Sequence, residues 1–381
     1  MPNGYEIACY YFPNYHVDPR NEAAHGPGWT EWELVPRTEP RFPGHRQPRV
    51  PLWGYEDESD PLVMARKIDT AADHSIDVFI FDWYFYDDGP FLERGLEQGF
   101  LAASNRDRLK FALMWANHDW VNIHPAQLST TASHAQLLYP GSVTRQTFDT
   151  LVDLVIERYF KHPSYWLIDG CPYFSIYELH TLIDGLGGIE PTRDALNSFR
   201  DRVKAAGFPD LHLNDVAWDL PFLPDETALE NPQPILEDLG FDSLTSYVWI
   251  HHVPLPTFPE TSYQYAMENA VDYWQQMRDS FTLPYYPNVT MGWDSSPRTV
   301  QSDRFINAGY PFMTTLSGNT PQAFHQALVE VKQFLDQQDK ARIFTINAWN
   351  EWTEGSYLEP DTVEGMAYLE AIRTVFGQAT Q

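Results

Sequence analysis

Apolar and aromatic residues recur along the chain in short runs of strand length, and segments with the apolar spacing of helices separate these runs. This alternation is typical of parallel βα units, in which a helix follows each strand. We count eight units, which predict an α/β fold with a single closed (β/α)8 barrel of the TIM type. The predicted strands are residues 5–12, 77–84, 110–115, 172–178, 211–216, 243–249, 285–293 and 342–349.

The segments between the predicted strands carry residues that favour helix boundaries. Asp60-Pro61, Glu190-Pro191 and Thr320-Pro321 each place a capping residue before a proline at the first helical position. Gly207 ends one predicted helix just before the fifth strand. Because no Ser/Gly-rich linker, low-complexity tract or repeat of fixed period interrupts the chain, we expect residues 1–381 to form one domain.

The first connection, residues 13–58, is unusually long and rich in Pro, Gly, Trp and His. Connections of this length in a compact domain are usually functional or disordered, and the tryptophans here argue against disorder. Barrels of this class build their sites at the carboxyl ends of the strands. We therefore expect this long first loop to be ordered and to cover the mouth of the barrel. A second long connection, residues 117–142, follows the third strand.

Charge narrows the range of partners. The chain has 25 Lys and Arg residues against 53 Asp and Glu residues, a formal net charge of −28. Such a field repels the phosphates of nucleic acids and anionic membrane surfaces, so we expect neither as a partner. The first residues run directly into the first predicted strand without a signal-like segment, which predicts a cytoplasmic protein, although an exported protein whose signal had been removed would look the same. The oligomeric state stays open.

The sequence favours neither a metal site nor a cofactor. Cys9 and Cys171 are too few for a disulfide framework and lack the spacing of a structural zinc site. His251 and His252 are adjacent, so on a strand they would face opposite sides, and no third ligand is evident.

Aromatic, amide and acidic side chains gather at the carboxyl ends of the predicted strands. Aromatic rings stack on the C–H faces of sugars while carboxylates and amides bind hydroxyl groups, so this mixture predicts a carbohydrate site. The candidate substrate-binding residues are Tyr11, Asp82, Trp83, Tyr84, Trp115, Asn117, Tyr177, Tyr247, Trp293, Asp294, Arg298 and Asn350, with Trp29, Trp32, His45 and Gln47 in the first connection. Structural alternatives stay open: Trp29, Glu31 and Trp32 could pin the loop, and Arg298 could only neutralise Asp294.

The most specific stretch is residues 346–360, INAWNEWTEGSYLEP, at the end of the eighth predicted strand. Glu351 and Glu354 are three positions apart and can both face one pocket. Glycoside cleavage needs one carboxylic acid to protonate the departing oxygen and a second carboxylate as nucleophile, base or charge stabiliser. The alternative is a pair of solvated loop acids, but the flanking Trp349 and Trp352 favour a catalytic pair.

Five motifs in chain order resemble the glycoside hydrolase family 99-like group, and specifically its WbsX-like branch. They are YYFPNYH at residues 10–16, GWTEW at 28–32, GHRQP at 44–48, GWDSSPR at 292–298 and NEWTEG at 350–355, so the resemblance covers nearly the whole chain. It implies a (β/α)8 barrel. It also implies a relation to the true family 99 enzymes, which are endo-acting, retaining α-mannosidases and α-mannanases.

The resemblance further implies a mechanism. In family 99 the carboxylate matched by Glu351 deprotonates the 2-hydroxyl of the sugar in the −1 subsite, which attacks the anomeric carbon to give a 1,2-anhydro sugar. The one matched by Glu354 protonates the leaving oxygen and then activates water. Spacing alone does not distinguish this route from an ordinary double displacement. The resemblance suggests an α-mannoside or a related glycan as the substrate. The chain has Thr353 where family 99 has His, and residues 26–51 are a WbsX-type segment, so specificity for mannose itself stays open.

Two other functions compete with a glycoside hydrolase. A sugar-nucleotide glycosyltransferase of polysaccharide biosynthesis is disfavoured because the chain lacks a clear Asp-x-Asp metal motif and a Gly-rich phosphate loop, and because its charge opposes a diphosphate donor. A non-catalytic carbohydrate-binding protein would not need the pair Glu351 and Glu354. The sequence does not specify the sugar, the linkage, or endo against exo action.

Overall fold

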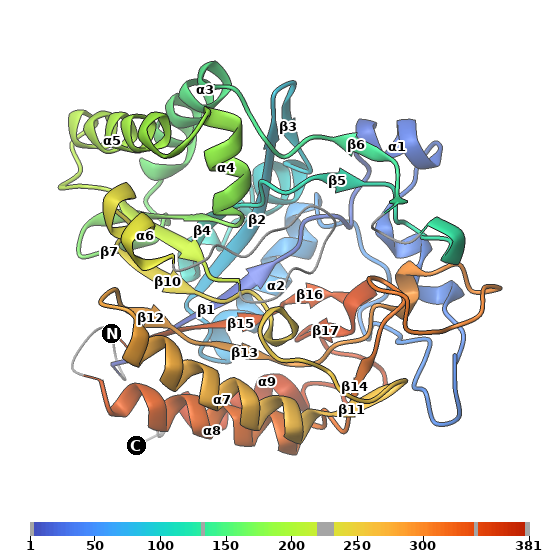
Figure 1. Ribbon diagram of the computed structural model, residues 1–381. Coiled ribbons are helices and arrows are strands. Elements are labelled where there is room, and N and C mark those ends of the chain that lie inside the picture. The colour runs from blue at the N-terminus through green and yellow to red at the C-terminus, as the bar shows by residue number, and fades with distance from the viewer. Residues whose placement is uncertain (1–3, 131–133, 219–231, 339–341, 378–381) are drawn as a thin grey trace.

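The computed structural model describes residues 4–130, 134–218, 232–338 and 342–377, and a parallel sheet lies at its centre (Figure 1). The sheet order is β12-β10-β9-β8-β4-β2-β1-β15-β13. Its strands are β1 (Glu6–Tyr11), β2 (Val78–Tyr86), β4 (Lys110–Trp115), β8 (Cys171–Ile176), β9 (His212–Val216), β10 (Ser243–Thr245), β12 (Tyr285–Tyr286), β13 (Asn288–Thr290) and β15 (Ile343–Asn347). All eight predicted strands therefore form, the seventh as the pair β12 and β13.

The seventh strand joins the two ends of the sheet. β12 pairs with β10, and β13 pairs with β15. Pro287 separates the two halves because a proline has no N–H to donate to a neighbouring strand. Its carbonyl oxygen still accepts a hydrogen bond of 2.9 Å from the Thr345 amide. The predicted (β/α)8 barrel is confirmed, and it is closed except at this break.

Helices surround the barrel, and two of the three predicted N-terminal caps are found at their predicted positions. They are α1 (Pro19–His25), α2 (Pro61–Asp73), α3 (Arg145–Val155), α4 (Leu179–Leu186), α5 (Ile189–Ala205), α6 (Gln233–Leu239), α7 (Tyr263–Ser280), α8 (Pro321–Asp336) and α9 (Ala367–Phe376), with π-helical turns η3 (Gly95–Phe100) and η7 (Ile156–Phe160). Asp60 and Thr320 cap α2 and α8 as predicted, since their side chains accept hydrogen bonds from first-turn amides.

The predicted cap at Glu190 is wrong. Gly188, with φ 119°, is the N-cap of α5, and Glu190 lies within its first turn. The reason is the turn between two helices: Gly187 ends α4 in the left-handed conformation, and Gly188 continues with a positive φ that other residues rarely adopt. The chain therefore enters α5 earlier than the Glu-Pro pair indicates.

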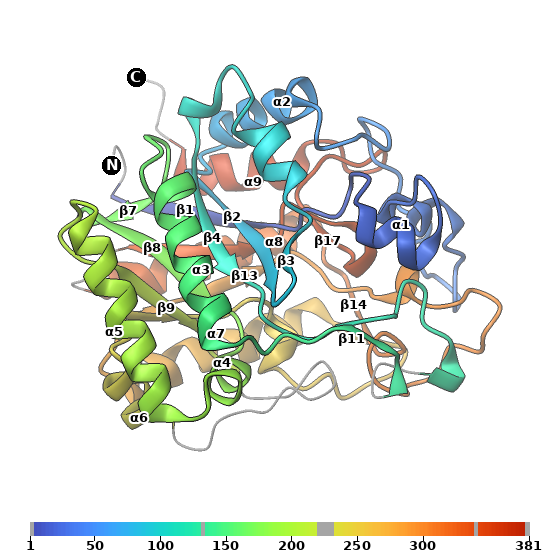
Figure 2. The same cartoon turned by 90° about the horizontal axis from the view of Figure 1, so that it is seen from above.

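Shorter elements complete the chain, many of them at the carboxyl ends of the barrel strands. They are β3 (Gly89–Phe91), β5 (Trp120–Val121), β6 (Leu137–Tyr139), β7 (Leu167–Ile168), β11 (Glu260–Ser262), β14 (Thr315–Ser317), β16 (Asn350–Glu351), β17 (Ser356–Tyr357), and the 3-10 turns η1 (Glu31–Glu33), η2 (Val35–Arg37), η4 (Arg106–Arg108), η5 (Leu128–Thr130), η8 (Trp249–His251), η9 (Ser296–Arg298) and η10 (Trp352–Glu354). In Figure 1, α1, β5, β6, β16 and β17 gather on the right of the barrel. Figure 2 shows α1 on the right and α5 and α6 on the left.

Polar side chains form hydrogen-bonded layers inside the barrel. Asn214 on β9 donates to Ser243 on β10 at 2.9 Å and accepts from Ser175 on β8 at 2.9 Å. Asn288 on β13 donates to Thr345 on β15 at 3.0 Å. All five residues are buried, and each has found a partner, as buried polar groups usually do. These bonds link neighbouring strands beneath the carboxyl end.

The first connection, residues 13–58, is anchored by the buried carboxylate of Glu58. This group accepts hydrogen bonds from the Tyr11 hydroxyl at 2.9 Å and from the Tyr15 amide at 2.8 Å, and it lies 3.1 Å from Nδ1 of His16. The Trp32 indole donates to the Glu56 carbonyl at 2.8 Å, so the tryptophan helps to hold the loop. These contacts explain why a long polar connection is ordered. Among the helices that the structure describes, none combines the length and the apolar character needed to cross a bilayer.

Candidate active site

A pocket with about 620 Å³ of space between its walls, part of it open to solvent, lies at the carboxyl ends of the barrel strands. The sequence-predicted residues that line it are Asp82, Tyr84, Tyr177, Tyr247, Trp293, Arg298, Glu351 and Glu354. The other lining residues are Phe12, Met114, Ala116, His118, Asp119, Trp120, Val121, Ile123, His124, Val248, His251 and Tyr310. Rings and acids thus surround one cavity.

Glu351 and Glu354 reach this pocket because the chain turns sharply after β15. Glu351 ends β16, η10 follows, and Gly355 then adopts a φ of 63°, in the left-handed region. A Cβ at Gly355 would lie 2.7 Å from Cβ of Asp294, so no larger residue fits there without a shift. The turn leaves Glu351 3% exposed and Glu354 5% exposed, both on the pocket wall.

Arg298 connects the two carboxylates. Its Nη2 lies 3.2 Å from Oε2 of Glu351, and its Nη1 is hydrogen-bonded to Oε1 of Glu354. The Tyr310 hydroxyl donates to the same Glu354 oxygen at 2.7 Å. Arg298 therefore serves the carboxylate pair rather than Asp294.

A third carboxylate, Glu31, contacts the same guanidinium. Nε of Arg298 lies 2.9 Å from Oε1 of Glu31, and the Thr353 hydroxyl also donates to that oxygen. Asn14 donates to the other oxygen at 2.5 Å. Glu31 is fully buried and lies in η1, so the first connection supplies a charge to the site from behind the pocket wall. That this connection also covers the mouth stays a prediction.

Three carboxylates around one guanidinium leave the site rich in negative charge. Burial, and then the charge of Glu354, raise the pKa of Glu351 well above its usual range, against the opposing effect of Arg298. Burial also raises the pKa of Glu354, opposed by Arg298 and by the hydrogen bond from Tyr310. Because the two groups interact, the pair shares its protons and titrates as a unit. It retains a proton at a higher pH than an ordinary carboxyl group.

Asp82 belongs to the same cluster through Tyr247. The Tyr247 hydroxyl lies 2.8 Å from Oδ2 of Asp82 and 3.1 Å from Oε1 of Glu351. One hydroxyl has one proton, so both contacts are good hydrogen bonds only when one of the two carboxyl groups is itself protonated. Burial raises the pKa of Asp82 well above its usual range, which agrees with this geometry.

Asp294 does not line the pocket, and neither do its partners His45 and Gln47. Nε2 of His45 and Nε2 of Gln47 each lie 2.7 Å from Oδ2 of Asp294. The Asp294 amide donates to the backbone carbonyl of Glu354 at 2.5 Å. These three residues thus fix the turn that carries Glu354.

The hydrogen-bonded carboxylate of Asp294 predicts a pH-dependent contribution to stability. Although burial opposes it, the hydrogen bond and charge of His45, with Ser296 and Gln47, lower the pKa of Asp294 from 3.8 to about 2. A depressed folded-state pKa stabilises the fold above the unfolded pKa, by about 2 kcal/mol here, and this contribution is lost as the pH falls from about 4 to about 2. We expect Asp294→Asn to lower the free energy of unfolding by that amount at pH 7 and by less near pH 3, as measured by urea denaturation. A difference independent of pH would contradict this account.

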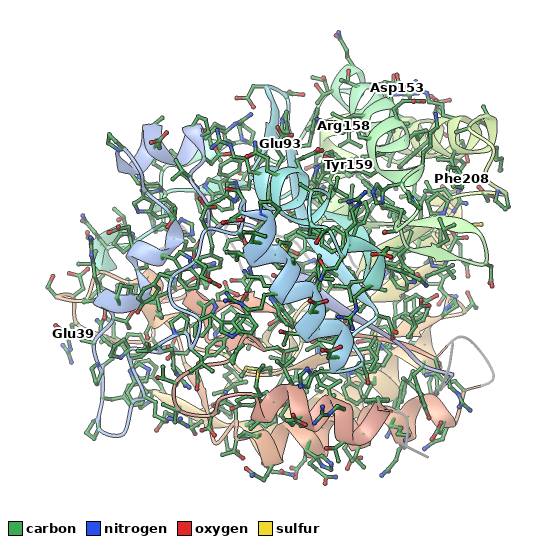
Figure 3. All side chains as sticks on the ribbon, turned by 180° about the vertical axis from the view of Figure 1, so that it is seen from behind. Glu39, Glu93, Asp153, Arg158, Tyr159 and Phe208 are labelled. Carbon is green, nitrogen blue, oxygen red and sulfur yellow. The ribbon has the colours of Figure 1, made fainter. Side chains whose placement is uncertain are left out.

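Two predicted tryptophans on the strands face away from the pocket. Side chains alternate along a strand, so Asp82 and Tyr84 face the pocket while Trp83 faces the helices. Trp83 packs edge-on against Tyr159 of η7, with ring centroids 6.2 Å apart; Tyr159 lies near Arg158 and Glu93 in Figure 3. Trp115 donates from its indole to the Phe85 carbonyl at 3.1 Å. The alternation of side chains along a strand is the sequence signal that separates these two tryptophans from the residues that face the pocket.

Two predicted amides bind backbone groups instead of lining the pocket. Nδ2 of Asn117 donates to the Glu178 carbonyl at 2.7 Å, and Oδ1 accepts from the Glu178 amide at 2.8 Å. Asn350 makes the same pair of bonds to Phe12, at 2.7 and 2.8 Å. Each amide therefore ties one strand end to the next, and Asn350 holds Phe12 at the pocket wall.

The predicted aromatic residues of the first connection also lie outside the pocket lining. Trp29 stacks on His25 with centroids 4.2 Å apart and meets His124, a lining residue, edge-on at 6.3 Å. Trp32 lies 5.9 Å from the Trp352 ring. Tyr11, which ends β1 just before this connection, is also outside the lining: it is fully buried and donates to Glu58. These residues support the site through their neighbours.

Several lining residues had no clear signal in the sequence. Trp120 and His124 lie in the second long connection, and their rings stack 5.4 Å apart. Tyr310 lies in an irregular segment twelve positions after Arg298, so nothing in the pattern indicated that it would reach Glu354. For Trp120 and His124, the unusual length of the connection 117–142 was the one sequence feature that pointed to a role.

Comparisons with known proteins place the chain in a family. The family model described as Glycosyltransferase WbsX matches residues 7–372. The chain belongs to this family. Two related proteins called WxcX, from two strains of Xanthomonas campestris pv. campestris, are 28% identical over 389 residues and 29% identical over 388 residues. Each match covers 98% of this WbsX family member but 50% of its relative, so the chain spans half the length of the curated proteins it matches.

Two solved structures with a similar fold are a glycoside hydrolase and a glycoside hydrolase-like protein. The GH99 endo-alpha-mannosidase from Bacteroides thetaiotaomicron has a TM-score of 0.57 at 15% identity, over 98% of this chain and 96% of that one. A glycoside hydrolase-like protein has a TM-score of 0.59 at 15% identity, over 98% and 94% of the two chains. The resemblance to the WbsX-like branch of the family 99-like group is confirmed. This WbsX family member therefore combines a family named for glycosyltransferases with a fold of glycoside hydrolases.

Proposed function

We propose that this protein is a retaining glycoside hydrolase that acts on an oligosaccharide or polysaccharide. The observation that carries the proposal is the buried pair Glu351 and Glu354, which contact adjacent nitrogens of one guanidinium, that of Arg298. Two carboxylates this close suit the retaining mechanism, because inverting enzymes need room for a water molecule between them. A protein that only binds sugars has no use for such a costly buried cluster.

The pocket walls favour an uncharged sugar. Asp82 and Asp119 offer hydroxyl acceptors, and Tyr84, Trp120 and Trp293 offer rings. Among the described lining residues the permanent cation is Arg298, and its contacts are taken by carboxylates, so no guanidinium is left for a diphosphate. This argues for hydrolysis over transfer from a sugar nucleotide. An α-mannoside is the first substrate to test, because of the resemblance to the endo-alpha-mannosidase.

In the proposed mechanism Glu354 is the general acid and base, and Glu351 acts on the sugar 2-hydroxyl. Without a substrate, the proton that the pair shares is more stable on Glu351 than on Glu354, because hydrogen bonds from Arg298 and Tyr310 stabilise the ionised form of Glu354. The proposed roles therefore require the sugar to draw the proton toward Glu354 on binding. The alternative is that the two roles are reversed and Glu351 is the acid. Substitution of each carboxylate in turn distinguishes the two assignments.

Incubation of the protein with bacterial and fungal polysaccharides and α-mannans, followed by NMR of the first product, tests the proposal. We expect released reducing ends with the anomeric configuration of the substrate, and none with the double variant Glu351→Gln/Glu354→Gln. Inverted product would contradict the retaining mechanism. A covalent ester trapped on Glu351 with a 2-fluoro sugar would replace the 1,2-anhydro route by a direct nucleophile. Absence of hydrolysis across the whole panel would reject the hydrolase.

A further inference from the structure

A second pocket lies beside the candidate active site, between the ends of β8, β9 and β10 and the outer helices. It has about 490 Å³ between its walls. In Figure 1, α4 and α6 lie above β10, and α7 lies below β12. Most of its lining is apolar, with Leu179, Val216, Leu236, Met277 and Phe281 among its residues. The proposed function makes no use of this pocket.

Asp215 places a carboxyl group in this apolar setting. Its neighbour Asn214 faces the barrel interior, so Asp215 faces the helices on the opposite side of β9. Asp215 is 6% exposed, lines the pocket, and has no hydrogen-bond partner for Oδ1 among the described residues. Burial raises its pKa well above the usual range of an aspartate. An unpartnered buried carboxyl group destabilises the fold, so its presence points to a ligand.

A single layer of aromatic rings separates the two pockets. Trp218 lines the second pocket, and its indole donates to the Tyr177 carbonyl at 2.8 Å. Its ring stacks on His251 with centroids 3.6 Å apart and an interplanar angle of 19°. Tyr177 and His251 both line the candidate active site. The linings of the two pockets are therefore in direct contact through Trp218.

We propose that the second pocket is an accessory subsite for one uncharged sugar unit of the glycan, with Asp215 bound to its hydroxyl groups and the apolar lining against its C–H face. This inference rests on the proposed function. Glu178 adds a second carboxyl group to the lining, and the described lining residues include no Lys or Arg. Among its described residues, a lining of this kind offers no lysine or arginine to a phosphate or another anionic group, which leaves neutral sugars, or an amine, as ligands.

The test uses the full chain carrying Glu354→Gln, so that sugars are not consumed. Binding of mannotriose, maltotriose, cellotriose and chitotriose is measured by saturation-transfer NMR and titration, with benzylamine as the amine probe. We expect Asp215→Leu to weaken binding of at least one trisaccharide about tenfold or more, since hydrogen bonds to a carboxylate are lost. Asp215→Asn should keep most of the affinity, and Asp201→Leu, which removes an exposed carboxyl group on α5, should keep all of it.

Thermal melting adds a second readout. Asp215→Leu should raise Tm by a few degrees, because the buried carboxyl group has no structural partner to lose; a lower Tm would contradict the proposal. Equal trisaccharide affinity with and without Asp215, no trisaccharide binding at all, or Asp215-dependent binding of benzylamine alone would also overturn it.

The same experiments separate this inference from the proposed function. Asp215-dependent sugar binding in a wild-type protein that cleaves no glycan would reject the hydrolase and keep the subsite. If wild type cleaves glycans, and Asp215→Leu cleaves long and short ones with unchanged kcat/KM, the hydrolase stands and the subsite is rejected.

Discussion

Replacement of Glu354 by Gln is expected to lower turnover of a natural glycoside by about 10²- to 10⁴-fold, the usual contribution of a proton-transfer group. The physical reason is that the departing sugar oxygen then leaves without a proton. A substrate with a nitrophenolate leaving group needs no such proton, so Glu354→Gln should retain far more of its first-step activity there. Glu351→Gln should be equally slow on both substrates, because activation of the attacking group is required whichever group departs.

The measurement is kcat/KM of each variant on a matched pair of natural and nitrophenyl glycosides. Glu190→Gln, which alters an exposed carboxyl group of α5, is the control and should match wild type. Rescue of Glu351→Gln but not of Glu354→Gln by the better leaving group would reverse the two roles. Circular dichroism of each variant confirms that activity is lost without loss of the fold.

Replacement of Arg298 by Met is expected to destabilise the fold by about 3–5 kcal/mol at pH 7, because removing one partner of a buried ion pair leaves an uncompensated charge. Glu31 suffers most. Although burial opposes it, Arg298 and then His124 lower the pKa of Glu31, so it is ionised in the native protein. Its ion pair stabilises the fold above the usual pKa of a glutamate and loses this effect as the pH falls below it. The destabilisation should therefore shrink in acid.

Urea denaturation of Arg298→Met at pH 7 and pH 4 tests this expectation. Arg37→Met is a suitable control, since Arg37 pairs with Glu33 on the surface, where such pairs contribute about 1 kcal/mol or less. A loss as small as that of the control would mean that the three carboxylates are protonated in the native protein and need no cation. Arg298→Lys should recover only part of the stability, since an ammonium group cannot reach three carboxylates as a planar guanidinium does.

The barrel was predictable from the sequence because its signal is periodic and repeated. Each of the eight apolar runs formed barrel strand, the seventh as the two strands β12 and β13, and Asp60 and Thr320 capped helices at the predicted positions. The break at Pro287 was not predicted, since a strand can continue on both sides of one proline when different neighbours pair with each half.

The candidate site was predictable only where strand ends carry it. The position of Asp82 and Tyr84 at the end of a strand correctly predicted that they line the pocket. The same prediction for Trp83 is wrong, because side chains alternate along the strand and Trp83 faces the helices. The sequence singled out Glu31 only as one of three residues that could pin the first loop. Its bond to Arg298 joins positions 267 apart in the chain, and no local sequence pattern predicts a contact over such a separation. Tyr310 is missed for the same reason.

The bond between Glu31 and Arg298 limits how this protein can be re-engineered. Loops on barrels of this class are often regarded as exchangeable parts that can be grafted to change selectivity. Here a graft of residues 13–58 would remove Glu31 and the Asn14 that holds it, and Arg298 would be left to two carboxylates instead of three. Transplanted loops should therefore keep both residues, or the acidity of Glu351 and Glu354, the proposed catalytic pair, will change along with the selectivity.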